Sequence, residues 1–268
     1  MSTPDHLLLP MSNNSNNKPL LHFIHLTDCH LGDSPDAIIN GYNTFNSLGK
    51  ICQHIKHHDQ HPDFILFTGD ISQTGTLKSY ELFQGIVNQL DYPIYCLPGN
   101  HDNPLLLKKL FPDSPLNNPV FLQINGVALV LINSTVEGKE YGQIKTNVIP
   151  QFNSFFHEHP QIPTIISMHH PLVNTQTPWM DALAIHNSRE VQQYFAAKQN
   201  IKLVLNGHAH MDIQQKKGHT FYLGTPSTCY QFKPGAVDLE YDMCSPGYRL
   251  ISLRENLAVE NTLYRIKL

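Results

Sequence analysis

Short apolar runs alternate with polar turns along most of the chain, and their length of four to six residues is typical of buried β-strands. Five of these runs end in Asp, Asn or His, and they predict strands over residues 22–27, 63–68, 94–97, 164–168 and from Ile201 onward. Between them, apolar residues recur at helical spacing, as at Leu48, Ile51 and Ile55. This spacing predicts helices over residues 42–58, 78–90 and 189–198, and a shorter helix over 150–157.

The order of these elements predicts the fold class. The first half reads β-α-β-α-β, the pattern of parallel strands joined by right-handed crossovers. Further along, Asn125-Gly126 separates the apolar runs 120–124 and 127–132, which is typical of a β-hairpin, and further strands are expected at 220–223, 248–253 and 259–266. We therefore expect an α/β protein in which two sheets pack face to face with helices outside.

Chain length and local composition bear on domain organisation. A length of 268 residues with 41% hydrophobic content suits one large domain. Residues 1–20 are rich in Asn and Ser and lack the basic start and long apolar stretch of a signal peptide, so we interpret them as a flexible leader. We expect residues 21–268 to form the folded domain.

Charge, hydropathy and cysteine content each argue against a class of function. A formal charge of -4 and a pI near 6.5 do not supply the basic face of a nucleic-acid-binding protein. No run approaches the roughly 20 apolar residues of a membrane helix. The five cysteines form no CxxC pair, which favours reduced thiols. We expect a soluble, cytoplasmic protein with no nucleic-acid or membrane partner, and the sequence leaves its oligomeric state open.

The five strand endings carry the side chains of a candidate metal site. They read Asp-x-His, Gly-Asp, Gly-Asn-His-Asp, His-His-Pro and Gly-His-x-His, and they place Asp28, His30, Asp70, Asn100, His101, Asp102, His169, His170, His208 and His210 after strands. Since strand carboxyl ends in α/β sheets converge on one crevice, these side chains should meet there. Imidazole and oxygen ligands suit Mn, Fe, Co and Zn alike, so the pattern predicts a metal centre.

This order of ligands resembles the calcineurin-like metallophosphoesterase superfamily, from about Leu21 to the C-terminus. Three further stretches, Thr225-Pro-Ser-Thr-Cys229, Gln231-Phe-Lys-Pro234 and Gly41-Tyr-Asn-Thr44, are similar to bacterial class III 3′,5′-cyclic-AMP phosphodiesterases. The resemblance implies a two-sheet α/β/β/α sandwich with a dinuclear metal site at the strand carboxyl ends. It also implies hydrolysis of 3′,5′-cyclic AMP to 5′-AMP by attack of a metal-bridging hydroxide.

The resemblance implies a role for each matching residue. One metal would be held by Asp28, His30 and His210, and the other by Asn100, His169 and His208, while Asp70 would bridge both with its two carboxylate oxygens. The two divalent ions would be Fe or Mn, with Zn or Co as alternatives. The residues implied to bind the substrate, a small cyclic nucleotide, are His30, Asp70, Asn100, His101 and His208.

The sequence allows more than one role for several residues near the predicted ligands. The family pattern His-x-Pro favours His169 over His170 as the ligand, which leaves His170 as a neighbouring or pocket residue. His101 would stabilise the phosphoryl group or protonate the leaving oxygen. Asp102 would orient His101, or else serve as a turn or helix-cap carboxylate. Trp179 would stack on a base or pack its loop onto the domain.

Other functions of the same superfamily remain alternatives, namely a broad-specificity phosphodiesterase, a phosphatase or a nuclease. The protein phosphatases place Asp-Arg after Gly-Asn-His, whereas this chain continues with Asp102-Asn103. A non-catalytic scaffold should lack some of the ligands, and all are present. Because no Arg or Lys falls within the matched motifs, we expect diesters to be preferred over the more highly charged monoesters.

Overall fold

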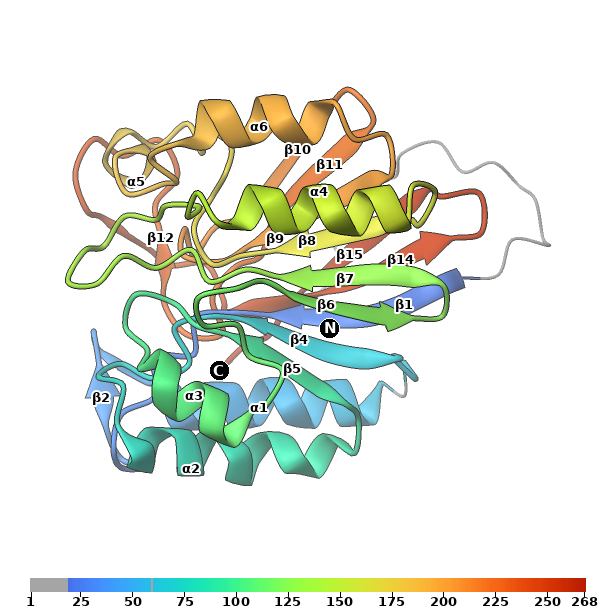
Figure 1. Ribbon diagram of the computed structural model, residues 1–268. Helices are drawn as coiled ribbons and strands as arrows, with labels where there is room; N and C mark the ends of the chain where they lie inside the picture. The colour runs from blue at the N-terminus through green and yellow to red at the C-terminus, as the bar shows by residue number, and fades with distance from the viewer. Residues whose placement is uncertain (1–18, 59) are drawn as a thin grey trace.

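Two mixed β-sheets form the centre of the molecule, and the computed structural model describes residues 19–58 and 60–268 (Figure 1). The first sheet contains β1 (Pro19–Leu26), β4 (Phe64–Thr68), β5 (Ile94–Leu97), β14 (Gly247–Arg254) and β15 (Val259–Arg265). The second contains β6 (Val120–Ile124), β7 (Val127–Leu131), β8 (Thr164–Ser167), β9 (Ile201–Asn206), β10 (Ile213–Lys217) and β11 (Thr220–Gly224). Their orders are β15-β14-β1-β4-β5 and β10-β11-β9-β8-β7-β6.

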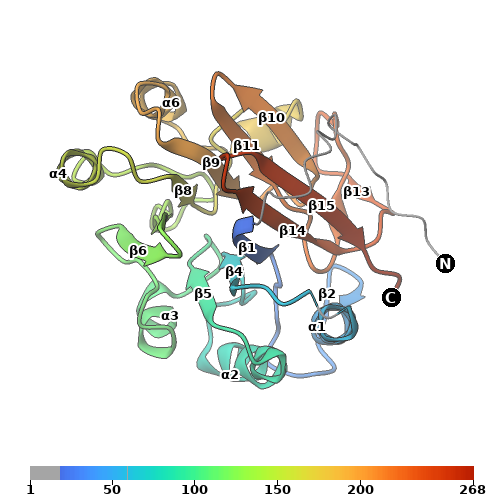
Figure 2. The same cartoon turned by 90° about the vertical axis from the view of Figure 1, so that its right-hand side faces the viewer.

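Helices cover the outer face of each sheet. On the first sheet lie α1 (Thr44–His57), α2 (Leu77–Val87), which runs on into the 3-10 helix η1 (Asn88–Leu90), and α3 (Pro104–Leu110). On the second lie α4 (Val148–Glu158), α5 (Pro178–Asp181) and α6 (Ser188–Ala196). Figures 1 and 2 show the two helical layers on opposite sides of the paired sheets. No helix in the described part of the chain has the length and apolar content needed to span a bilayer.

Three apolar layers separate these four layers of secondary structure. The central one lies between the sheets and joins Phe23 and Leu66 of one sheet to Leu129 and Leu205 of the other. The outer layers pack each sheet against its own helices. Strands buried on both faces are expected to read as continuous apolar runs, as β4 and β7 do. The predicted α/β/β/α sandwich is thereby confirmed.

Strand direction brings the polar turns together. In the first sheet β1, β4 and β5 run parallel, and in the second β7, β8, β9 and β11 do. A hydrogen bond joins the segment after β11 to the segment after β1, since Thr228 N donates to Thr27 O at 3.1 Å. The carboxyl ends of the central strands therefore face a common region.

Most predicted elements are present, with shifts at their ends. The first strand begins at Pro19 rather than at residue 22, and residues 1–18 of the predicted leader lie outside the described residues. The helix predicted from residue 42 begins at Thr44, because β3 (Tyr42–Asn43) pairs with β2 (Ile38–Ile39) and Asn43 caps the helix. Strand β10 was not predicted, since its sequence Ile-Gln-Gln-Lys-Lys is polar; it forms a sheet edge paired with β11. The small hairpin of β12 (Gln231–Phe232) and β13 (Tyr241–Asp242) was also missed.

Candidate active site

The backbone is left-handed at five of the predicted ligands. Asp28, His30, Asp70, His208 and His210 have φ of 55°, 46°, 49°, 64° and 48°. Such conformations are uncommon outside glycine and cluster at functional sites, although Asp and His adopt them more readily than most residues. These residues lie two or four positions beyond the ends of β1, β4 and β9, so the left-handed turns occur at the carboxyl ends of these strands.

Two glycines allow these turns to approach one another. A Cβ on Gly207 would lie 1.9 Å from Thr27 Oγ1, and a Cβ on Gly99 would lie 2.1 Å from Asp70 Oδ1. No larger residue fits at either position without moving a turn that carries a predicted ligand.

One group of ligand atoms comes from Asp28, His30 and His210. The Nε2 atoms of His30 and His210 lie 3.1 Å apart. Asp28 Oδ1 is 3.3 Å from His210 Nε2 and 3.9 Å from His30 Nε2. All three side chains are buried, so their atoms face one small space between the ends of β1 and β9.

A second group comes from Asn100, His169 and His208. His169 Nε2 lies 3.1 Å from Asn100 Oδ1 and 3.2 Å from His208 Nδ1. These residues follow β5, β8 and β9, so this group draws on both sheets.

Asp70 lies between the two groups. Its Oδ2 atom is 3.3 Å from His169 Nε2 and 3.7 Å from His30 Nε2. Its Oδ1 atom instead accepts a hydrogen bond of 2.9 Å from His101 N. One oxygen, Oδ2, therefore faces both groups, while Oδ1 fixes the turn after β5, and bridging of two metals through both oxygens stays a prediction.

Hydrogen bonds on the far side of the rings set the tautomer of these histidines. His169 Nδ1 donates to Thr68 O at 2.7 Å, and His210 Nδ1 donates to Tyr230 O at 2.8 Å. His30 Nδ1 donates to Gln73 Oε1 at 2.9 Å. In the neutral rings each Nε2 then carries a lone pair directed at the other ligands.

When the rings are neutral, lone pairs and carboxylate oxygens that face one another at such distances repel unless a metal ion or a shared proton lies among them. The donor set of imidazole nitrogen, carboxylate and amide oxygen suits a divalent transition metal. The backbone and side-chain acceptors on the Nδ1 atoms are the usual outer partners of metal-binding histidines. The residues present therefore fit metal binding, and either group could hold an ion.

The charged groups of the site shift one another's pKa values. Burial alone would raise the pKa of Asp70, but the charge and hydrogen bond of His169, with His101 and His30, hold it well below its usual range. Burial would lower the pKa of His169, yet Asp70 and Asp28 raise it to about 9. Burial lowers the pKa of His30 to about 3. Since a metal binds the neutral ring, metal binding must release the proton that His169 otherwise keeps.

His170 is buried beside His208 but both of its ring nitrogens are occupied. Nδ1 lies 2.9 Å from Ser134 Oγ, and Nε2 donates to Glu140 O at 3.0 Å. Burial and the neighbouring His169 lower its pKa to about 3, so the ring is neutral. This geometry supports His169, rather than His170, as the ligand.

His101 lies at the edge of the first group. Its ring is 4.9 Å from that of His30, edge to face, and its Nδ1 donates to Gln73 O at 3.0 Å. Nε2 is therefore left for other contacts, and one ring nitrogen lies within 4.8 Å of ligand atoms of His30 and Asp70. This is a suitable place for a proton donor or phosphoryl contact.

The predicted orientation of His101 by Asp102 is wrong. Asp102 Oδ2 accepts from Gly99 N at 2.9 Å and Ile71 N at 3.2 Å, and Oδ1 accepts from Ser72 N and Tyr80 OH, both at 3.0 Å. These donors occupy the carboxylate, so it does not contact the His101 ring. Burial and the charge of Asp70 raise its pKa to about 6. The helix cap is Asn103, so the turn interpretation of Asp102 is the one observed.

Sequence reasoning missed the outer partners of the ligands. Gln73 contacts His30 through its side chain and His101 through its carbonyl, and Thr68 and Tyr230 contribute carbonyl oxygens. Carbonyl acceptors of the main chain cannot be recognised from the sequence, because every residue has one. The position of Gln73 soon after the Gly69-Asp70 turn was the one available signal.

Trp179 and the 231–234 segment lie together beside the first group. The Trp179 ring meets Phe232 edge to face with centroids 4.9 Å apart, and Phe232 stacks on His210 at 4.4 Å. Trp179 therefore packs its loop against Phe232, next to the candidate metal ligands, and stacking of its ring on a base stays a prediction.

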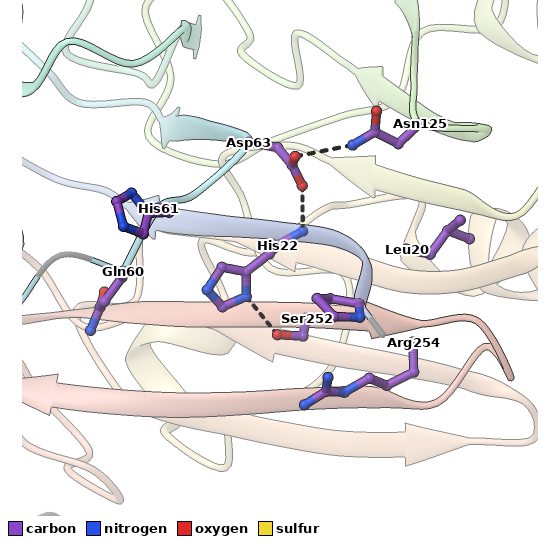
Figure 3. Close-up of a pocket in the computed structure, with 9 residues that line it drawn as sticks. Leu20, His22, Gln60, His61, Asp63, Asn125, Ser252 and Arg254 are labelled. Atoms are coloured by element: carbon purple, nitrogen blue, oxygen red, sulfur yellow. Dashed lines mark hydrogen bonds between the residues drawn. The ribbon is translucent and has the colours of Figure 1, made fainter. Parts of the chain in front are cut away.

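A separate pocket of about 410 Å³ lies at the other end of β1 (Figure 3). In it His22 Nδ1 lies 2.7 Å from Ser252 Oγ, and Asp63 accepts hydrogen bonds from His22 N and Asn125 Nδ2. Because β1 spans about 25 Å at the usual rise per residue, this pocket is remote from the predicted ligands. It contains none of the predicted site residues.

The sandwich and its His, Asp and Asn cluster together define a metallophosphoesterase. Residues 21–212 match the calcineurin-like phosphoesterase family, and the chain belongs to that family. It is 31% identical to a 3′,5′-cyclic-nucleotide phosphodiesterase of Nostoc, over 89% of this chain and 90% of the relative. It is 28% identical to the 3′,5′-cyclic adenosine monophosphate phosphodiesterase CpdA of Haemophilus influenzae, over 93% and 92% of the two chains.

A solved structure shares the fold at much lower identity. The crystal structure of a dimetal phosphatase from Danio rerio superposes with a TM-score of 0.66 at 11% identity, covering 92% of this chain and 100% of that one. This likeness supports the fold assignment alone.

Proposed function

We propose that residues 21–268 form a dinuclear metallophosphodiesterase that hydrolyses 3′,5′-cyclic AMP to 5′-AMP. The observation that carries the proposal is the position of Asp70 Oδ2 within 3.7 Å of His30 Nε2 and 3.3 Å of His169 Nε2. A carboxylate that reaches both ligand groups can bridge two metal ions, as a dinuclear centre needs. The relatives named above act on cyclic nucleotides and support the choice of substrate.

The proposed ligands fall into two sets, one for each metal ion, with one residue shared. Asp28, His30 and His210 would hold one ion, Asn100, His169 and His208 the other, and Asp70 both. Two divalent ions there would supply Lewis acidity and a water of lowered pKa for in-line attack. We propose Fe or Mn as the two ions, and the ligand set also accepts Zn or Co as alternatives.

His101 would complete the site on the side of the leaving group. Since Gln73 O holds the Nδ1 proton, the free Nε2 edge is the one that can contact a phosphoryl oxygen or protonate the departing 3′-oxygen. His30, Asp70, Asn100 and His208 would bind the phosphate through the ions they hold.

Charge supports a diester over a monoester. Among the described residues, no Lys or Arg side chain makes a hydrogen bond or ion pair with the seven proposed ligands. Lys233, on the adjacent hairpin, is paired with Glu240 at 2.7 Å. Arg249 is buried and engaged by Asp212 and Gly224. The ions and His101 would then balance one phosphate charge more readily than two.

Free thiols and overall charge support two further parts of the proposal. All five cysteines are unpaired, four of them buried, which fits a reducing, cytoplasmic setting. The net charge of -4 fits a small cyclic nucleotide rather than a nucleic-acid polymer as substrate.

The proposal is tested by assaying metal-loaded protein with cyclic AMP, cyclic GMP and 5′-AMP, and with bis-(p-nitrophenyl) and p-nitrophenyl phosphate side by side. The expected result is 5′-AMP as the end product and a higher kcat/KM for the diester. Asp70→Asn, which keeps the shape of the side chain, serves as the inactive control. Release of phosphate from 5′-AMP, or a monoester preference, would instead make the protein a phosphatase of the same family.

A further inference from the structure

Three stretches that the metal chemistry does not use converge beside the first ligand group. They are the β2–β3 hairpin with Tyr42, the β12–β13 hairpin with Phe232 and Tyr241, and α5 with Trp179. Figure 1 shows β2, β12 and α5 along the same edge of the molecule, at the carboxyl ends of the central strands.

The rings in these stretches form a continuous strip that starts at a metal ligand. Phe232 stacks on His210 with centroids 4.4 Å apart and an angle of 25° between the planes. Trp179 meets the edge of Phe232 at 4.9 Å, and Tyr241 lies 5.9 Å from it. Tyr230 packs beneath, 4.8 Å from His210 and 5.3 Å from His30. We refer to Phe232, Tyr241 and Trp179 as the aromatic strip.

Local contacts hold the strip in place. Phe232 and Tyr241 are direct cross-strand partners in the hairpin, so their side chains stand on one face. Lys233 pairs with Glu240 across the same hairpin. Gly235 N donates to Thr177 Oγ1 at 3.0 Å, which ties the hairpin to the segment that carries Trp179. A ligand would therefore meet a surface that needs no rearrangement.

The strip is only partly covered by the protein. Tyr230 is 3% exposed and serves as its floor, whereas Tyr241 is 44% exposed, and Phe232 and Trp179 are half-buried. Half-exposed rings next to a phosphate-binding centre are the arrangement used to stack nucleobases, because every base has an aromatic face.

We propose that the aromatic strip binds the purine base of the substrate, with Phe232 as its central contact. This inference rests on the proposed phosphodiesterase function, since a phosphate held at the metal ligands would leave the ribose and base to extend along the strip. Stacking reads the face of a base and not its hydrogen-bonding edge. The strip therefore determines preference for nucleotides over simple phosphate esters, with little discrimination between adenine and guanine.

Trp179 is the only tryptophan in the chain, so its fluorescence reports on this surface directly. Metal-loaded protein is titrated with 5′-AMP and with ribose 5-phosphate, which carries the same phosphate and sugar without the base. We expect 5′-AMP to change the Trp179 emission in a saturable manner and ribose 5-phosphate to leave it unchanged. By calorimetry 5′-AMP should bind about 5- to 150-fold more tightly, the usual contribution of one stacked base.

Two variants test whether the aromatic strip causes the difference in affinity, and a third controls for the loss of a packed aromatic ring. Phe232→Leu and Tyr241→Ser should each reduce the ratio of the two affinities, Phe232→Leu by at least about fivefold. Phe121→Leu is the matched control, because Phe121 is also half-buried and stacked, on Phe155 at 4.5 Å, but in the edge strand β6. Metal content is measured for each variant, since Phe232 touches His210 while Tyr241 contacts no proposed ligand.

Equal affinity of the wild-type protein for the two phosphates, or an affinity ratio unchanged in both strip variants, would overturn the proposal. These are binding measurements, so their outcome is separable from that of the proposed function. Hydrolysis of cyclic AMP without a base preference would refute the strip alone. A base preference that Phe232→Leu removes, in a protein that does not hydrolyse cyclic AMP, would uphold the strip and refute the phosphodiesterase.

Discussion

Asp70 Oδ2 lies 3.3 Å from His169 Nε2 and 3.7 Å from His30 Nε2, so one atom faces both ligand groups. Asp70→Ala should therefore weaken both metals and abolish activity, while Asp28→Ala should weaken only one. Metal content after dialysis, followed by activity assays in excess metal, distinguishes the two. Excess metal should partly restore Asp28→Ala and not Asp70→Ala. An active Asp70→Ala protein that keeps two ions would refute the bridging role.

His101 donates its Nδ1 proton to Gln73 O and is not needed as a ligand. His101→Ala should retain both metals and lose roughly 10²–10⁴-fold in turnover if the ring acts as a general acid. The loss should be smaller on bis-(p-nitrophenyl) phosphate than on cyclic AMP, because p-nitrophenolate leaves without protonation. Equal losses on the two substrates would point to phosphoryl stabilisation, and a missing metal would make His101 a ligand.

Gln73 holds the His30 ring through its side chain and the His101 ring through its main chain. Gln73→Ala should lower the affinity of the Asp28, His30 and His210 group for metal by about 10- to 100-fold, as outer partners of metal ligands usually do. Gln73→Glu keeps an acceptor for His30 Nδ1 and should restore much of that affinity. The ratio of activities on cyclic AMP and bis-(p-nitrophenyl) phosphate should stay unchanged in both variants, because the main-chain carbonyl of residue 73 still holds the His101 ring. Metal titration of the two variants checks this, and a leaving-group effect in Gln73→Ala would contradict it.

His25 is fully buried between Thr68 Oγ1, at 2.8 Å, and Thr225 Oγ1, at 2.7 Å. Burial, with the charge of Arg249, lowers its pKa from 6.5 to about 3. Between these values the unfolded chain binds a proton that the folded chain does not, so stability is complete above pH 6.5 and is lost as the pH falls toward 3.

The contribution of His25 to the pH dependence of the free energy of unfolding should reach about 1.4 kcal/mol per pH unit. His25→Gln should flatten that slope between pH 6.5 and 4.5, whatever its effect on absolute stability. Urea unfolding at fixed metal concentration measures the slope, with the exposed His57→Gln as a surface control. An unchanged slope in His25→Gln would show that His25 does not remain neutral in the fold.

The layers of the fold were predictable because strands that are covered on both faces of their sheet are continuous apolar runs, as in Phe64–Phe67 and Val127–Leu131. The pairing of β1 with β14 was not, since Phe23 and Ile251 are far apart in the chain and local patterns carry no information on such contacts. Strand β10 and the β12–β13 hairpin were missed because Gln214, Lys216 and Asp242 break the alternation of apolar residues.

The candidate ligands were predictable for a different reason. Their residue types and their positions after strands are both visible in the sequence, and parallel strands bring such positions together. The assignment of Asp102 failed because four donors, including Ile71 N and Tyr80 OH, reach it from turns whose approach only the folded structure defines. The use of a single Asp70 oxygen likewise depends on the amide of His101, which has no sequence signature.

The two-metal centre is tested most directly by anomalous diffraction from crystals of metal-loaded protein. Two peaks about 3.5–4 Å apart are expected. One should be bound by Asp28, His30 and His210, the other by Asn100, His169 and His208, with Asp70 Oδ2 in reach of both. A single peak, or a peak bound by His170 in place of His169, would contradict this assignment.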